Sequence, residues 1–147
     1  MVVKSGAIGY GKVDRIIIPQ GLRIVAGYFS SIDKKTVLLA PEKHEAINRL
    51  ARETMRRIML NPTLKIFLEN CKFFALNAGL ASDRCKELIV VAEKAGAIGA
   101  SQNMIGEAVY AVATPKNLEE VHAAFLSFLP EERIIITDID FSGARLL

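Results

Sequence analysis

Residues 95–107 read AGAIGASQNMIGE and mark a change in the character of the chain. The residues before them have helical periodicity, whereas Glu107 to Ala113 form an apolar run typical of a buried strand. Small side chains would let the backbone of this stretch approach a ligand, and successive amides could form an anion-binding concavity. A helix C-cap followed by a tight hairpin explains the composition equally well. Both interpretations therefore stay open.

Apolar residues at 3.6-residue spacing predict three helices upstream of this stretch. Pro41 is suited to the first turn of the first helix, and Asn61-Pro62 would end it. The second helix should stop near Gly79 and the third at Gly96, because glycine accepts the backbone conformation of a helix C-terminus. The crossover from the preceding strand is therefore predicted to be long and helical.

Strands are predicted at residues 12–18, 22–29 and 133–139, in addition to 107–113. A helix lies between the last two, where Asn117 and the following residues resemble a capping box. Without the first strand the order is βαββαβ, which predicts an α+β, ferredoxin-like layer with extra helices in its first crossover. We expect a single domain over residues 1–147, with an additional N-terminal strand and a flexible glycine-rich lead-in at 1–11.

The composition excludes several classes of function. Net charge is only +3, from 19 basic and 16 acidic residues, which does not favour nucleic-acid binding. The longest apolar runs are only a few residues, so no membrane-spanning segment is expected. Cys71 and Cys85 fall on apolar helix faces and are interpreted as buried hydrophobic residues of a cytoplasmic protein.

Three weaker candidate sites have structural explanations. His44 and His122 lie far apart without the companion ligands of a metal site, and neither cysteine has a local activating context. Arginines at 49, 52, 56 and 57 form a basic helix face that could bind an anion or an acidic partner. A solvated face is favoured, because Glu53 and Arg57 have the spacing of a helical ion pair.

Residues 95–107, followed by an apolar strand, resemble the third conserved motif of the GHMP kinases, in the form found in archaeal-type pantoate kinases. Residues 9–16 (GYGKVDRI) resemble the glycine segment and strand in the middle of those kinases. Residues 31–38 (SIDKKTVL) and 138–145 (DIDFSGAR) resemble two further stretches of the same family. These matches follow the family's order and extend over essentially the whole chain, which resembles the C-terminal half of such a kinase.

The resemblance implies ATP- and Mg²⁺-dependent phosphorylation of the primary hydroxyl of pantoate, on the archaeal route to coenzyme A. It also implies a homo-oligomer. The residues that it places beside substrate or phosphate are Gly96, Gly99, Ala100, Ser101, Gln102, Gly106 and Glu107, with Gly9, Gly11 and Thr36 as further possibilities. Among these, Ser101 could bind a substrate or phosphate oxygen, and Glu107 could be a functional carboxylate.

The family's phosphate-binding loop and N-terminal acidic residues are not found in this sequence. Phosphoryl transfer requires positioned phosphates and neutralised charge, so we expect the chain to be inactive alone. A separate or covalently linked N-terminal half would complete it, packing on an apolar patch near residues 12–29. The alternative is a free-standing ferredoxin-like module that binds a ligand or itself, with a closed polar surface there. An independent enzyme of another type has no supporting constellation.

Overall fold

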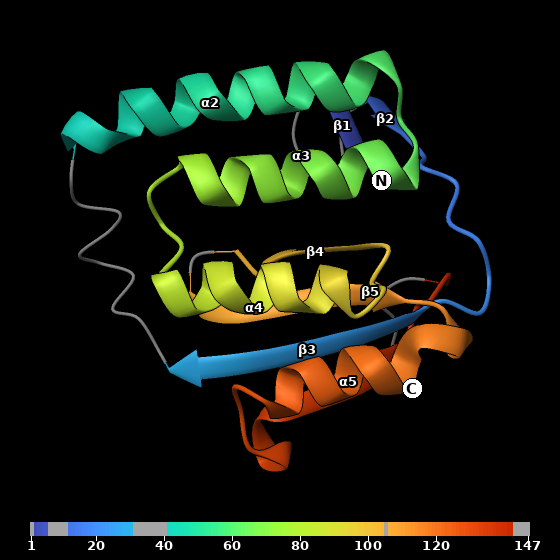
Figure 1. Ribbon diagram of the computed structural model, residues 1–147. Coiled ribbons are helices and arrows are strands. Elements are labelled where there is room, and N and C mark those ends of the chain that lie inside the picture. The colour runs from blue at the N-terminus through green and yellow to red at the C-terminus, as the bar shows by residue number, and fades with distance from the viewer. Residues whose placement is uncertain (1, 6–11, 31–40, 105, 143–147) are drawn as a thin grey trace.

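The computed structural model describes residues 2–5, 12–30, 41–104 and 106–142 (Figure 1). The elements in chain order are β1 (Val2–Ser5), β2 (Lys12–Asp14), β3 (Arg23–Ser30), α2 (Pro41–Leu60), α3 (Leu64–Asn77), α4 (Asp83–Lys94), β4 (Gly99–Gln102), β5 (Glu107–Ala113), the 3-10 helix η1 (Pro115–Asn117), α5 (Leu118–Leu126), the 3-10 helix η2 (Glu131–Arg133) and β6 (Ile134–Asp138). Within the described residues, no helix combines the length and apolarity needed to cross a bilayer.

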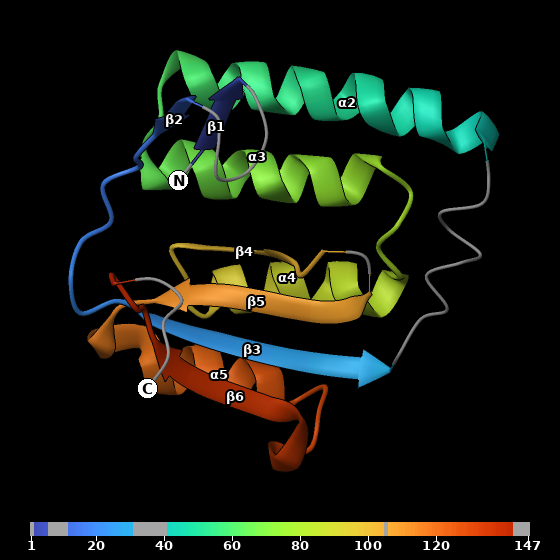
Figure 2. The same cartoon turned by 180° about the vertical axis from the view of Figure 1, so that it is seen from behind.

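The main sheet has four antiparallel strands in the order β4-β5-β3-β6. From β3 onward the elements follow the predicted βαββαβ order, with α2, α3 and α4 all in the first crossover. The ferredoxin-like α+β prediction is confirmed. Helices α4 and α5 lie on one face of the sheet, whereas α2 and α3 stack beyond its β4 edge (Figures 1 and 2).

One face of β3 forms the centre of the main core. Val25 and Phe29 are buried there beside α5 residue Phe125, which has no exposed surface. Gly27 lies between them and allows the helix to approach, because a Cβ atom at this position would lie 2.6 Å from Leu129 Cδ1 and 3.0 Å from Phe125 Cδ1. The alternation of β3 therefore places α5 directly against the sheet backbone.

The opposite face of the sheet is only partly covered. At one end, Leu68 of α3 packs with Leu22 and Val112 in a second core cluster. At the other end, Tyr28 and Ile135 are 49% and 60% exposed, and none of the described helices lies in front of β3 and β6 in Figure 2. We call this region the open face. It also includes Ala26, which pairs with Ile135 in the strand register, and Ala108, which pairs with Tyr28.

Two N-terminal predictions are corrected by the structure. The first predicted strand ends at Asp14 rather than residue 18, because the chain then leaves the strand and Ile16 packs against Ile58 of α2. Residues Val2–Ser5 of the predicted flexible lead-in form β1 and pair with β2 in a separate two-stranded sheet. The glycine segment at 6–11 lies outside the described residues.

The predicted helices are confirmed, but the capping box at Asn117 is wrong. Helices α2, α3 and α4 begin and end close to the predicted positions, and the Thr63 hydroxyl accepts a hydrogen bond from Ile66 N at the start of α3. The Asn117 side chain makes no cap bond to α5. Its Nδ2 instead donates to Gly96 O at 2.9 Å, since that carbonyl group needs a partner where α4 ends.

We predict that Phe125→Ala lowers the free energy of unfolding by about 3–5 kcal/mol, because it opens a cavity against Gly27 in the main core. Leu126→Ala is the matched control, since Leu126 is the next residue of the same helix and is 44% exposed. It should change stability by less than about 1 kcal/mol. Urea denaturation followed by circular dichroism measures both, and equal losses would contradict the assigned core.

Candidate functional site

The end of α4 explains the first glycine of the predicted site. Gly96 has a φ of +97°, a conformation in which side chains are strained, and a Cβ atom there would lie 2.7 Å from Asn117 Nδ2. The amide of Ala97 donates to Ala92 O at 3.1 Å, as expected at a glycine-terminated helix. Gly96 therefore has a structural role at the α4–β4 connection.

Gly99 and Ala100 contribute to packing. A Cβ atom on Gly99 would lie 2.8 Å from Leu68 Cβ, so glycine is what allows α3 to lie against β4. Ala100 has no exposed surface and faces the core formed with α4. Gly99 therefore does allow a close approach to the backbone, and the element that approaches it is helix α3.

The Gln102 side chain makes hydrogen bonds that hold the β4–β5 hairpin in place. Its Nε2 donates to Gly106 O at 2.7 Å and to Leu80 O at 3.1 Å, which ties the hairpin to the α3–α4 connection. Met104 lies at the hairpin tip with a φ of +54° and is 86% exposed. For Gly106 the nearest atom to an added Cβ is 4.0 Å away, so sterics do not require glycine there.

Glu107 belongs to a charged cluster at the start of β5. Arg84 donates to both Glu107 carboxylate oxygens, one contact being 3.1 Å from Nε to Oε1, and the Ser30 hydroxyl donates to the same carboxylate. The Arg84 guanidinium also lies 4.9 Å from the centre of the Phe29 ring. The predicted functional carboxylate is thus paired with a cation from α4 and is 12% exposed.

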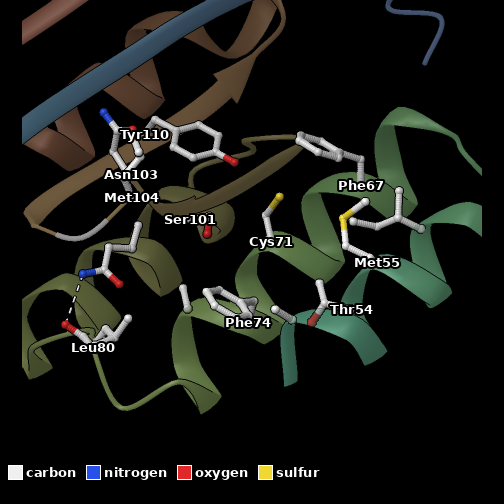
Figure 3. Close-up of a pocket in the computed structure, with 14 residues that line it drawn as sticks. Thr54, Met55, Phe67, Cys71, Phe74, Leu80, Ser101, Asn103, Met104 and Tyr110 are labelled. Carbon is white, nitrogen blue, oxygen red and sulfur yellow. Dashed lines mark hydrogen bonds between the residues drawn. The ribbon is translucent and has the colours of Figure 1, made fainter. Parts of the chain in front are cut away.

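Ser101 faces a cavity of about 480 Å³ between α2, α3 and the β4–β5 hairpin. In Figure 3 its hydroxyl, the Cys71 thiol and the Tyr110 hydroxyl all point into the space enclosed by these elements. The lining residues are Ala51, Thr54, Met55, Ile58, Phe67, Cys71, Phe74, Ala75, Leu80, Ser101, Gln102, Asn103, Met104 and Tyr110. The site residues Ser101 and Gln102 therefore belong to a cavity wall.

The cavity wall carries no formal charge at neutral pH. Burial raises the pKa of Tyr110, and the neighbouring Cys71 raises it further. Burial also raises the pKa of Cys71, with a smaller opposing effect from its hydrogen bond to Tyr110. The other lining residues have no ionisable side chain, so the whole lining is neutral.

Sequence reasoning missed the cavity residues Cys71, Thr54 and Tyr110. The apolar periodicity of α2 and α3 assigns the first two to a packed helix face, and Tyr110 lies within an apolar strand. The alternation of β5 places Tyr110 opposite Val109 and Ala111, which gives the only signal that it faces away from the main core.

The remaining sequence candidates do not form a site in the described part of the chain. Arg57 is engaged by Glu53 at 2.5 Å and by the Phe73 ring at 4.3 Å, which supports the solvated-face interpretation. No group of three or more metal-ligating side chains occurs among the described residues. Gly9, Gly11 and Thr36 lie outside them.

Comparison with known proteins relates the chain to small-molecule kinases. No family model matches. A pantoate kinase of Methanocaldococcus jannaschii is 25% identical over 108 residues, which are 74% of this chain and 39% of that protein. A solved phosphotransferase related to the coenzyme A biosynthesis pathway superposes with a TM-score of 0.78 at 17% identity, over 94% of this chain and 44% of its own.

Two further solved structures share the fold at lower similarity. Mevalonate kinase of L. major has a TM-score of 0.55 at 14% identity, over 88% of this chain and 46% of its own. Homoserine kinase of Cytophaga hutchinsonii has a TM-score of 0.51 at 13% identity, over 92% and 45%. This chain spans less than half the length of each of these relatives. The chain is therefore similar in sequence to part of a pantoate kinase, and it shares its α+β fold with part of each of these solved structures.

Proposed function

We propose that this chain is the C-terminal half of an ATP-dependent kinase that phosphorylates pantoate, completed by an N-terminal half from the same or a separate chain. The observation that carries the proposal is the agreement between two independent comparisons. The sequence relative is a pantoate kinase, and the structure with a TM-score of 0.78 is a phosphotransferase related to coenzyme A biosynthesis. Both are matched over less than half of their length.

The chemistry of the described residues supports a division of labour between two halves. Phosphoryl transfer needs cations around the transferred phosphate, usually Mg²⁺ together with basic side chains. The hairpin cavity has a neutral lining, Arg84 is already paired with Glu107, and the described residues contain no cluster suited to a metal. These residues do not fit Mg-ATP, so we assign its binding mainly to the N-terminal half.

The open face is a suitable surface for that half. Tyr28 and Ile135 expose large apolar side chains on a sheet face, and Ile17 in the segment before β3 is 88% exposed. Large apolar side chains that are exposed on a sheet face can mark an interface. The alternative of a free-standing module predicts a closed, polar surface here, so the exposed side chains favour the kinase half. A homo-oligomer, as in the resembled family, would use another surface.

Within this proposal the hairpin tip is the part of the chain that approaches substrate. Among the candidate glycines that the structure describes, Gly106 alone has no steric reason to be glycine, and the nearby Met104 is exposed. Gly96, Gly99 and Ala100 support the tip by fixing β4 between α3 and α4. Ser101 and Gln102 hold it from behind, and Glu107 anchors the start of β5.

Activity should require both halves. We predict that this chain releases no ADP from Mg-ATP and pantoate by itself, because its described residues lack a phosphate-binding site. Addition of a candidate N-terminal half should restore pantoate-dependent ADP release in a coupled assay. Activity with neither mixture, when the added half is folded and binds ATP, would favour the binding module. Activity of this chain alone would contradict the proposed division.

A pair of glycine variants separates packing from function. Gly99→Ala should lower the free energy of unfolding by about 1–3 kcal/mol, because its Cβ would overlap with Leu68. Gly106→Ala should leave stability unchanged within about 0.5 kcal/mol, since the space around it is open, but should reduce activity of the two-half enzyme at least tenfold. Thermal melts and the ADP assay check both. Full activity of Gly106→Ala would show that the hairpin tip is not part of the active site.

Glu107 should act by positioning β5 through Arg84. A double-mutant cycle with Glu107→Gln and Arg84→Met should give a coupling of about 0.5–1 kcal/mol in unfolding experiments, kept small because Arg84 is half-exposed. Lys86→Met is the matched control on α4, because Lys86 pairs with Asp83 instead. Coupling near zero for Arg84 would leave Glu107 free to contact substrate and would contradict the positioning role.

A further inference from the structure

The cavity behind the hairpin has the dimensions of a small-molecule site. Its volume of about 480 Å³ falls within the range of pockets that bind small ligands, roughly 300–1,000 Å³. Its walls come from three separate elements, with Met55 on α2, Phe74 on α3 and Tyr110 on β5 (Figure 3). The cavity opens to solvent beside Met55 and Met104, which are 37% and 86% exposed, so a ligand could enter from that side.

The lining specifies the charge of a suitable ligand. None of the residues around the cavity carries a charge at neutral pH, and the raised pKa values keep both Cys71 and Tyr110 protonated. An anion bound against these walls would lose part of its hydration without gaining a cationic partner. The cavity is therefore unsuited to phosphate or to a carboxylate such as that of pantoate, and suited to a neutral molecule.

Three hydroxyl groups, from Thr54, Ser101 and Tyr110, and the amides of Gln102 and Asn103 make these walls partly polar. Thr54 is only 6% exposed, and its Oγ1 has no hydrogen-bond partner among the described residues. Ser101 is 1% exposed and shares a hydrogen bond with Tyr110 on the other side. Buried hydroxyl groups are normally satisfied, so an orphan hydroxyl lining a cavity indicates a partner supplied from within it.

We infer that this cavity is a binding site for a compact, uncharged molecule with an apolar body and one hydroxyl or carbonyl group that pairs with Thr54. The site lies behind the hairpin tip that the proposed function places near substrate, and the inference does not depend on that function. Asn103 and Met104 of the hairpin tip also line the cavity, so an occupant would touch that segment from behind.

The first test compares two probes of matched shape and different charge. Cyclohexylmethanol and cyclohexanecarboxylate are titrated into the full chain at pH 7.5 while the ¹³C-labelled methionine methyl groups are followed by NMR. We expect a saturable shift of the Met55 signal with the alcohol, and binding of the carboxylate at least tenfold weaker. Absence of saturable alcohol binding, or equal binding of the carboxylate, would overturn the inference.

A cavity-filling variant locates the site. Ala51→Leu places a larger side chain on the α2 wall and should weaken alcohol binding at least tenfold. Ala123→Leu is the matched control, because Ala123 is exposed on α5, which packs on the opposite face of the sheet. Both variants are first compared with the original chain by thermal melts. Equal affinities of the two folded variants would place the alcohol elsewhere and overturn the assignment.

The isosteric change Thr54→Val tests the hydroxyl itself and keeps the fold. It should raise the melting temperature by a few degrees, because an unpartnered buried hydroxyl is removed. It should weaken cyclohexylmethanol binding severalfold and leave binding of methylcyclohexane, which has no polar group, unchanged. An unchanged alcohol affinity, or equal losses for both probes, would show that Thr54 does not pair with the ligand.

Discussion

The contact of Phe125 and Leu129 with the backbone of Gly27 fixes the arrangement of the whole sheet. Because Gly27 has no side chain, α5 lies directly on β3, and α4 covers the same face beside it. Both helices of the βαββαβ unit are thereby committed to one face. The other face is left to α3 at one end and to the open face at the other. The cavity and the exposed apolar side chains are consequences of this one-sided packing.

The β4–β5 hairpin divides its residues between support and exposure. Gly99 and Ala100 point to opposite sides of β4 and pack against α3 and the main core, whereas the tip around Met104 reaches solvent. Gln102 connects the hairpin to the rest of the fold by donating to Gly106 O within the hairpin and to Leu80 O in the α3–α4 connection. In the proposed kinase this motif of small residues would serve the site indirectly, because most of its members fix the packing of the strand before the tip. Rigid support is what positions groups accurately for catalysis.

Much of the fold could be predicted from the sequence, because helix periodicity and strand-forming runs are local properties. The order of these elements was sufficient for the ferredoxin-like layer, and a glycine-terminated α4 was sufficient to locate Gly96. Contacts between distant residues were not predictable. Asn117 turns away from its own helix to bind Gly96 O, and Glu107 pairs with Arg84 on another element. The cavity was missed for the same reason, since Thr54 and Tyr110 line it from positions more than fifty residues apart in the sequence.

We propose that the open face of this chain binds an N-terminal kinase half. Isothermal titration of a folded, ATP-binding N-terminal half into this chain tests it directly when repeated with Ile135→Lys. The control is Val90→Lys, because Val90 is 47% exposed on α4, which covers the opposite face of the sheet. We predict at least tenfold weaker binding for Ile135→Lys, since a lysine there would be desolvated, and unchanged binding for Val90→Lys. Equal affinities of the two variants would contradict the account.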